Sequence, residues 1–186
     1  LTRWHSTQHG EVSPDRFIPV AEETGLILSL GEWVLRNACR RCVELQRQTG
    51  RMLRLAVNVS PRQFQQKTLP QLLHTILDET GLPAHCMELE ITEGMLMQSP
   101  EESTEVLRAL RRLGIAIVVD DFGTGYSSLA YLTRFPIDKI KIDRSFVRDI
   151  AADAADAAVV NAIIAMARSL DIRVIAEGPE TEEQEQ

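Results

Sequence analysis

Acidic, amide and amine side chains recur at the ends of short apolar runs rich in β-branched residues. In sequence order they are Asn58, Glu90 with Glu93, Asp120 with Asp121, Lys141 with Asp143, and Glu177. Carboxylate and amide oxygens, without a cluster of sulfur or imidazole groups, are ligands that suit Mg²⁺ or Mn²⁺. Two such ions about 4 Å apart clamp a phosphodiester, activate a water molecule and stabilise the leaving oxygen. These residue types therefore indicate metal-assisted cleavage of a phosphate ester.

Asp120 and Asp121 are adjacent, which restricts how both can serve one site. Consecutive strand residues point to opposite faces of a sheet, so both carboxylates can face the site only if the strand has ended. The glycines in the run from Phe122 to Gly125 predict a turn there. One of the two carboxylates would then bridge two ions, and Lys141 would hold the attacking water or the phosphate.

Each of these residues also has a purely structural explanation. Asp and Asn commonly cap helices that follow strands, glycines turn the chain, and Lys141 can be a solvated charge at a strand end. Capping explains the recurrence at successive strands less well. An acidic cluster without cations would repel itself, so the recurrence favours a metal site.

The elements that must position these side chains alternate along the chain. Strands are predicted at 55–60, 87–92, 115–120, 139–143 and 173–177, and helices at 69–80, 100–113 and 153–170, while 14–50 is predicted to be helical. Such alternation fits an open doubly wound sheet or a closed barrel. The glycine-rich phosphate loops typical of the open sheet are missing from the sequence. We therefore expect a TIM-like (β/α)8 barrel, lacking its first and last strands in this chain, with the polar strand ends on one face.

The composition of the chain restricts its expected binding partners and its expected cellular location. The net charge of −7 argues against attraction to a nucleic acid polymer or an anionic membrane, and a phosphate ester would need cations to screen it. No apolar stretch approaches the ~20 residues of a spanning helix. The three cysteines and four histidines have neither disulfide nor zinc spacing. We expect this segment to be cytoplasmic. This expectation is compatible with a membrane anchor elsewhere in the parent protein.

Seven ordered motifs make the chain recognisable. They are Leu1-Thr-Arg-Trp4, the run from Phe17 to Ile27, Asn58-Val-Ser60, Glu90-Ile-Thr-Glu93, the run from Asp120 to Leu129, Lys141-Ile-Asp143 and Ala176-Glu-Gly178. Together they resemble the EAL-domain family of cyclic di-GMP phosphodiesterases over essentially the whole chain, with Leu1 as the last letter of Glu-Ala-Leu. The resemblance implies one EAL domain over 1–186, truncated at both ends.

The resemblance also implies a role for each matching residue. Asn58, Glu90 and Asp120 would bind a first metal, and Asp120, Asp121 and Glu177 a second, so that two Mg²⁺ or Mn²⁺ ions are expected. The implied catalytic residues are Lys141, which positions the nucleophilic water, Glu177, Glu93, which tethers the loop of the Asp-Asp pair, and Asp143, which supports the water and metal shell. Arg3 would contact a substrate phosphate, and Glu180 would lie near the bound nucleotide.

The implied reaction is hydrolysis of cyclic di-GMP to linear pGpG in bacterial second-messenger signalling, without a covalent intermediate. The resemblance also implies a homodimer and leaves open a sensor or GGDEF domain fused upstream.

Three departures from the family pattern keep alternatives open. The family usually continues with a final strand, a Gln-Gly motif and a helix, whereas this sequence ends at Gln186. The Glu of Glu-Ala-Leu would precede Leu1 by two positions, and Pro179 replaces the usual Val. One alternative is a degenerate EAL domain that binds cyclic di-GMP as a receptor without hydrolysis. A second is a barrel lyase that forms a Schiff base on Lys141.

Overall fold

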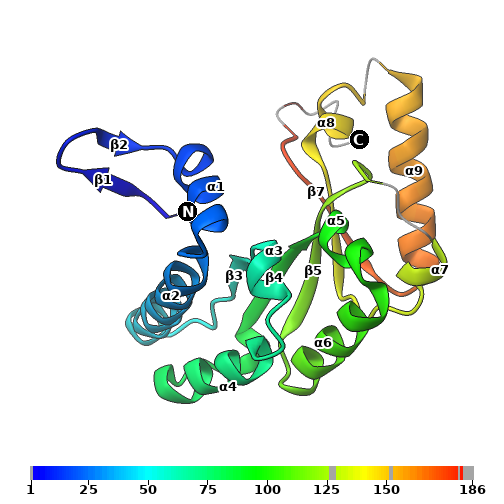
Figure 1. Ribbon diagram of the computed structural model, residues 1–186. Helices are drawn as coiled ribbons and strands as arrows, with labels where there is room; N and C mark the ends of the chain where they lie inside the picture. The colour runs from blue at the N-terminus through cyan, green and yellow to red at the C-terminus, as the bar shows by residue number, and fades with distance from the viewer. Residues whose placement is uncertain (1, 126–128, 151–152, 180, 182–186) are drawn as a thin grey trace. The chain divides into compact units, whose positions relative to one another are not determined.

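The computed structural model describes residues 2–125, 129–150, 153–179 and 181 (Figure 1). The chain divides into two compact units, Leu1–Met87 and Glu88–Gln186. The first unit is mostly helical, and the second alternates parallel strands with helices.

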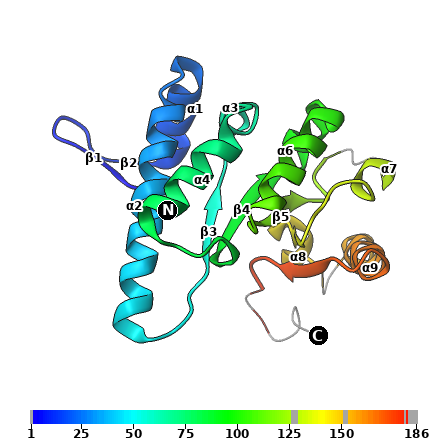
Figure 2. The ribbon, with the colours of Figure 1, turned by 90° about the horizontal axis from the view of Figure 1, so that it is seen from below.

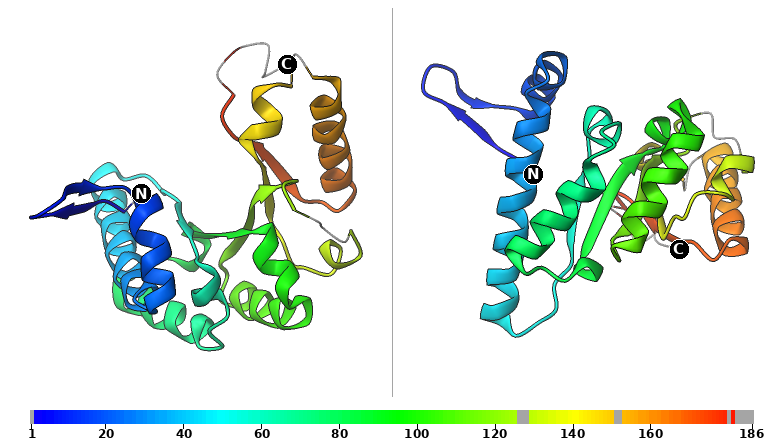
Figure 3. Two further views of the ribbon diagram at one scale, coloured as in Figure 1. Left: turned by 45° about the horizontal axis from the view of Figure 1, so that its top comes forward. Right: turned by 60° about the horizontal axis from the view of Figure 1, so that its bottom comes forward.

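The first unit begins with a hairpin and two helices. Strands β1 (Trp4–Ser6) and β2 (Gly10–Val12) pair antiparallel, and the hairpin extends from the start of α1 (Pro14–Thr24) (Figure 3). Helix α1 ends at Gly25, whose φ of 79° is the left-handed conformation that glycine adopts without strain. The indole ring of Trp4 meets the Phe17 ring edge-on at a centroid distance of 5.9 Å, which anchors the hairpin to α1.

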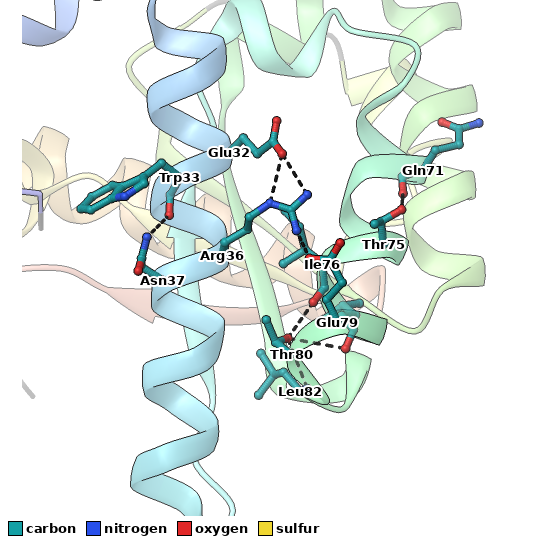
Figure 4. A network of polar contacts seen from close by, with 11 residues as sticks. Glu32, Trp33, Arg36, Asn37, Gln71, Thr75, Ile76, Glu79, Thr80 and Leu82 are labelled. Atoms are coloured by element: carbon teal, nitrogen blue, oxygen red, sulfur yellow. Dashed lines mark hydrogen bonds and ion pairs between the residues drawn. The ribbon is translucent and has the colours of Figure 1, made fainter.

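Helix α2 is the long element of this unit, and it packs against α4 (Figure 2). The remaining elements are α2 (Ile27–Thr49), β3 (Leu55–Asn58), α3 (Pro61–Phe64), α4 (Leu69–Thr80) and the short 3-10 helix η1 (Ala84–Cys86). Leu35 of α2 and Leu73 of α4 are almost completely buried. At its edge the Arg36 guanidinium bridges the carboxylates of Glu32 and Glu79, which ties α2 to α4 (Figure 4).

The segment that follows Asn58 is held by a capping box. Ser60 Oγ accepts a hydrogen bond from the backbone N–H of Gln63, and Gln63 Oε1 accepts from the backbone N–H of Ser60. The Gln63 side chain is buried against Gly31 of α2, where an added Cβ would lie 2.0 Å from Gln63 Nε2. Glycine at position 31 is therefore needed for this close approach.

The second unit is built on a parallel sheet. Its elements are β4 (Met87–Thr92), α5 (Glu93–Gln98), α6 (Pro100–Arg112), β5 (Ala116–Phe122), α7 (Leu129–Leu132), β6 (Lys139–Ile142), α8 (Arg144–Arg148), α9 (Ala154–Ser169) and β7 (Arg173–Ala176). The strands lie in the order β4-β5-β6-β7, and each neighbouring pair is parallel. Helices α5 and α6 pack on β5, and α9 packs on β6 and β7 (Figure 1).

The two faces of these strands differ in chemistry. One face carries apolar side chains with 0% exposure, namely Leu89, Ile91, Ile117, Val119, Ile140 and Ile142. Side chains alternate along a strand, so the intervening residues lie on the opposite face. On β4 and β6 those residues are Glu88, Glu90, Lys139 and Lys141. The apolar face therefore supplies the core under the helices, and the other face carries the charges.

The predicted alternation of parallel strands and helices is confirmed. The strand predicted at 87–92 and the helix predicted at 69–80 match β4 and α4, and other boundaries shift by one or two residues. The hairpin β1-β2 was not predicted, because each of its strands has three residues and no alternation to detect. No helix in the described part of the chain is long and apolar enough to cross a membrane.

Candidate metal centre

A β-bulge brings two consecutive carboxylates to the same site. Val119 pairs with Ile140 and Phe122 pairs with Ile142, so Asp120 and Asp121 of β5 together lie opposite Lys141 of β6. Such bulges bend a strand and re-aim its side chains. Asp121 has a φ of 52°, a left-handed conformation that non-glycine residues adopt rarely and that Asp tolerates better than most.

The bulge corrects the prediction that β5 ends at Asp120, and the predicted turn follows two residues later, from Gly123. The strand continues to Phe122, and the chain stays in the sheet. The extra residue at the bulge breaks the alternation of side chains between the two faces of the sheet. The sequence predicted that a turn would do this instead. As predicted, both carboxylates face one site, where both lie close to Glu177.

Lys141 lies at the centre of this site and bridges three strands. Its Nζ lies 3.1 Å from Glu90 Oε1, 3.0 Å from Asp120 Oδ1 and 2.5 Å from Glu177 Oε1. The side chains of Lys141, Glu90 and Asp120 are 12–14% exposed, and that of Glu177 is 33% exposed. The ammonium therefore sits among carboxylates that are mostly shielded from water but open on the side of Glu177.

Three carboxylates are close enough to share one ion. One oxygen from each of Asp120, Asp121 and Glu177 lies within 4.8 Å of the other two. The backbone N–H of Glu177 donates to the carbonyl of Ile142 at 3.2 Å, which fixes Glu177 at the end of β7 beside β6. With Glu90, four carboxylates gather near the ammonium of Lys141, so acidic groups outnumber basic ones among these five described side chains. Hard divalent cations fit such an all-oxygen set.

The pKa values reflect this crowding. Burial, followed by the charges of Asp120, Asp143 and Glu177, raises the pKa of the Asp121 carboxyl, and Lys141 opposes the shift. Burial by itself would lower the pKa of Lys141. Hydrogen bonds to Glu177, Asp120 and Glu90 outweigh it, so the pKa of Lys141 is raised and the side chain is an ammonium.

Asp143 begins the helix that follows β6. Its Oδ1 accepts hydrogen bonds from the backbone N–H of Ser145, at 2.9 Å, and from the Ser145 hydroxyl, as an N-cap of α8. These bonds, chiefly the one from the hydroxyl, lower the pKa of Asp143. Asp143 also interacts with Asp121, so a helix cap borders the acidic cluster.

Glu93 connects α5 to the end of β5. Its side chain is 3% exposed, and Oε2 accepts a hydrogen bond from the backbone N–H of Gly123 at 2.9 Å. An added Cβ on Gly125 would lie 2.9 Å from Glu93 Oε1, so the loop passes directly over the carboxylate. The residues after the bulge are therefore fastened to the start of α5.

The remaining predicted site residues lie elsewhere. Asn58 ends β3 and Arg3 precedes β1, both in the first unit, so their approach to the carboxylates stays a prediction. Glu180 lies outside the described residues.

The ion pair between Glu88 and Lys139, which lies on the strands that carry Glu90 and Lys141, was not predicted from the sequence. A signal for it existed, because each residue precedes a predicted site residue by two positions and so shares its face.

The fold and the site together define a parallel α/β protein whose charged cluster lies at the carboxyl ends of its strands, as in TIM-like barrels. The EAL domain profile matches residues 1–186, and the chain belongs to the EAL domain family. Solved EAL domains, which are TIM-like barrels, share its architecture and confirm the predicted fold class.

Several named proteins resemble the chain closely. "Cyclic di-GMP phosphodiesterase NbdA" of Pseudomonas aeruginosa is 45% identical over 184 residues, which cover 99% of this chain and 24% of NbdA. "Bifunctional diguanylate cyclase/cyclic di-GMP phosphodiesterase MucR" of the same species is 43% identical over 187 residues, covering 100% of this chain and 27% of MucR. The chain thus spans about a quarter of the length of these relatives.

Solved structures of EAL domains resemble this chain as well. A structure titled "PaMucR Phosphodiesterase, c-di-GMP complex" superposes with a TM-score of 0.91 at 44% identity, covering 98% of this chain and 74% of that one. The FimX EAL domain gives a TM-score of 0.90 at 24% identity, covering 99% of this chain and 73% of that one, and supports the fold alone.

Proposed function

We propose that this chain is the catalytic part of a metal-dependent cyclic di-GMP phosphodiesterase, which hydrolyses one phosphodiester of its substrate to give linear pGpG. The observation that carries the proposal is the contact of Lys141 with Glu90, Asp120 and Glu177, in a chain of the EAL family. Relatives named as cyclic di-GMP phosphodiesterases, and one solved as a cyclic di-GMP complex, support the choice of substrate.

The carboxylate cluster fits Mg²⁺ or Mn²⁺ by its donor chemistry, and we assign two ions to it. Asn58, Glu90 and Asp120 would hold one ion, and Asp120, Asp121 and Glu177 the other. When bound, the ions would polarise the phosphodiester and lower the pKa of a water molecule. The excess of acidic over basic groups among the described side chains of this cluster supports this assignment, because divalent cations would relieve the repulsion between the carboxylates.

Lys141 would orient the attacking water or the phosphate. A fixed ammonium among carboxylates can donate hydrogen bonds to an oxygen nucleophile and stabilise negative charge that develops on the phosphoryl oxygens. Glu177 would share the water with Lys141, to which it is paired at 2.5 Å. Glu93 would act indirectly by holding the backbone beyond Asp121, and Asp143 would support the cluster through its contact with Asp121.

Substrate contacts would come from residues outside the cluster. Arg3 is exposed and has the planar guanidinium that suits a phosphate, and Glu180 would lie beside the nucleotide.

We further assign the segment to the cytoplasm, where its three buried free thiols would stay reduced. A homodimer and a fused sensor or GGDEF domain complete the proposal. The bifunctional name of MucR supports a fused domain.

The two alternatives differ from this proposal at Lys141. A Schiff-base lyase needs a neutral amine, and the raised pKa of Lys141 keeps it protonated, which disfavours the lyase. A receptor that binds without hydrolysis needs neither the lysine nor the excess of carboxylates. Their presence together favours the enzyme.

The test is turnover of cyclic di-GMP by the full-length protein with Mg²⁺ or Mn²⁺, followed by chromatography for pGpG. We expect turnover that EDTA abolishes and that Glu90→Ala lowers at least about 100-fold, because an interaction with the reacting centre is lost. Tight binding of cyclic di-GMP without turnover would establish the receptor instead. Borohydride trapping of a carbonyl substrate on Lys141, with EDTA-insensitive turnover, would establish the lyase.

A further inference from the structure

The ring of Phe146 packs against the backbone just beyond the paired carboxylates. A Cβ added to Gly123 would lie 2.9 Å from Phe146 Cε2 and 3.4 Å from Ile163 Cδ1, so both side chains rest on the Gly123 backbone. Phe146 belongs to α8 and Ile163 to α9, and these two helices pack together. Gly123 also has a φ of 101°, which a residue with a side chain rarely adopts. The absence of a side chain at position 123 therefore makes room for the ring.

A second contact, of different chemistry, holds the same residue. The backbone N–H of Gly123 donates to Glu93 Oε2 at 2.9 Å. One hydrogen bond fixes the distance between two atoms and leaves the chain free to pivot about it, whereas a close-packed ring blocks sideways movement. Glu93 and Phe146 thus restrict the Gly123 backbone in complementary ways.

Helix α8 contacts both segments that carry carboxylates of the cluster. Its N-cap, Asp143, donates its backbone N–H to the carbonyl of Phe122 at 3.4 Å. The Cβ of Arg144 lies 3.4 Å from the place that a Cβ on Gly178 would take, and Gly178 directly follows Glu177. The helix therefore touches the chain directly after the Asp-Asp pair and directly after Glu177.

Asp121 is held against two unfavourable effects. Its φ of 52° lies in the left-handed region, which costs free energy for a residue with a side chain. Its carboxylate lies close to those of Asp120 and Glu177, and like charges repel each other until a cation binds. Gly123 is two residues away. Freedom at Gly123 would therefore let the backbone relax and the Asp121 carboxylate turn away from the cluster.

We propose that Phe146 is a positioning residue, whose ring holds the Gly123 backbone and thereby keeps the Asp121 carboxylate in place for a metal ion. The ring has no atom that binds a hard cation or transfers a proton, so it acts only through Asp121. Glu93 and Asp143 keep their contacts when the ring is removed, so the loss of metal affinity is partial. This inference rests on the proposed metal centre, and its effect on turnover rests on the proposed phosphodiesterase function.

The experiment measures Mn²⁺ affinity by calorimetry in the full-length protein. We expect Phe146→Ala to lower the affinity about 10-fold, because the space beside Gly123 is left empty. Phe146→Leu refills most of that space and should lower the affinity less than about threefold. Because the defect lies in metal binding, saturating Mn²⁺ should restore kcat for cyclic di-GMP in Phe146→Ala to within about threefold of the parent value.

Phe135→Ala is the matched control. Phe135 is 5% exposed, stacks on Tyr131 and precedes β6, at the end of that strand opposite Lys141. Its replacement also removes a buried ring from the second unit, so it should lower the melting temperature. It should leave the Mn²⁺ affinity unchanged, because this ring does not touch the chain that carries Asp121.

The route through Asp121 is tested by adding Phe146→Ala to Asp121→Asn. In that background the ligand is already lost, so Phe146→Ala should change the remaining Mn²⁺ affinity less than about twofold. If Phe146→Ala does not fold, Phe146→Val takes its place, with an expected loss between those of Phe146→Ala and Phe146→Leu.

Three results would each overturn the positioning role. They are parental Mn²⁺ affinity in the folded Phe146 variants, an equal loss of affinity in the parent and Asp121→Asn backgrounds, and a loss of the same size in Phe135→Ala. A parent protein that binds Mn²⁺ and does not hydrolyse cyclic di-GMP would overturn the proposed function alone, since the Mn²⁺ affinities still decide the role of Phe146.

Discussion

Glu93 accepts a hydrogen bond from the backbone N–H of Gly123 at 2.9 Å, which joins the first residue of α5 to the chain just beyond β5. Gly123 follows Asp121 by two positions, so this bond lies next to the bulge that presents the paired carboxylates. A buried carboxylate that holds the backbone here can influence the proposed metal centre without touching substrate.

Substitutions of Glu93 can distinguish its hydrogen bond to the Gly123 backbone from the effect of its negative charge. Glu93→Ala removes the acceptor, and such charge-assisted bonds are worth about 1.5–3 kcal/mol. If the loss falls on the transition state, kcat drops about 10- to 100-fold. Glu93→Gln keeps an acceptor oxygen and should retain most of the activity. Glu101→Ala removes an exposed carboxylate that accepts from the Tyr131 hydroxyl, and it should change nothing. Full kcat in Glu93→Ala would contradict the tether.

Lys141→Met should affect turnover and metal binding in opposite directions. Without the ammonium, the carboxylates of Glu90, Asp120 and Glu177 lose a cation that competes with metal, so calorimetry should show tighter Mn²⁺ binding. Turnover of cyclic di-GMP should fall about 100-fold or more, because the group that orients the nucleophile is lost. Lys141→Arg keeps the charge and should leave metal affinity near that of the parent. Weaker Mn²⁺ binding in Lys141→Met would refute the competition.

Asp121 is a proposed metal ligand, and its backbone is in the left-handed conformation. Substitutions can distinguish the effect of the carboxylate from that of the backbone conformation. Asp121→Asn tolerates the φ of 52° and removes a charge from a crowded cluster, so the metal-free protein should be at least as stable as the parent. Asp121→Val should be less stable than Asp121→Asn by about 1–2 kcal/mol, since a β-branched residue strains this conformation. Urea unfolding measures the difference, and both variants should lose Mn²⁺ affinity.

Asp171 offers a matched control, because its φ is 57° and it lies on the turn between α9 and β7. Asp171→Val should lose similar stability relative to Asp171→Asn, and neither should alter Mn²⁺ affinity. Equal Mn²⁺ affinity in Asp121→Asn and the parent protein would remove Asp121 from the metal centre.

Cys39 makes the stability of the first unit depend on alkaline pH. Burial, followed by the charge of Cys42, raises the pKa of Cys39 from its ordinary value of 9.0 to about 11. The folded state holds the thiol proton more tightly than the unfolded state. Its contribution to the free energy of unfolding is therefore complete below about pH 9 and is lost as the pH rises toward 11. Urea unfolding at pH 8, 9 and 10 measures the decline.

The control for this decline is Cys39→Ala, which has no thiol to titrate at that position. The variant loses stability at every pH because a buried side chain is shortened, but its loss of stability between pH 8 and pH 10 should be smaller than that of the parent. Parallel pH profiles for the two proteins would show that Cys39 does not contribute.

Much of the fold could be predicted because the signals are local. The strand at 87–92 alternates Glu88 and Glu90 with buried Leu89 and Ile91, and helix α4 ends at Gly81 in the left-handed conformation. The order of the motifs likewise predicted the family. The short hairpin β1-β2 could not be predicted, because its three-residue strands depend on the packing of Trp4 against Phe17.

The sequence by itself determined which groups can do the chemistry: a row of carboxylates and one lysine at successive strand ends, whose types suit divalent cations. Only the tertiary structure decided how they meet. The bulge that turns both Asp120 and Asp121 toward Lys141 depends on the register between β5 and β6, and the contact of Glu88 with Lys139 joins residues 51 positions apart across an intervening strand. Register and contacts at that separation arise when strands pair, so no local pattern in the chain can specify them.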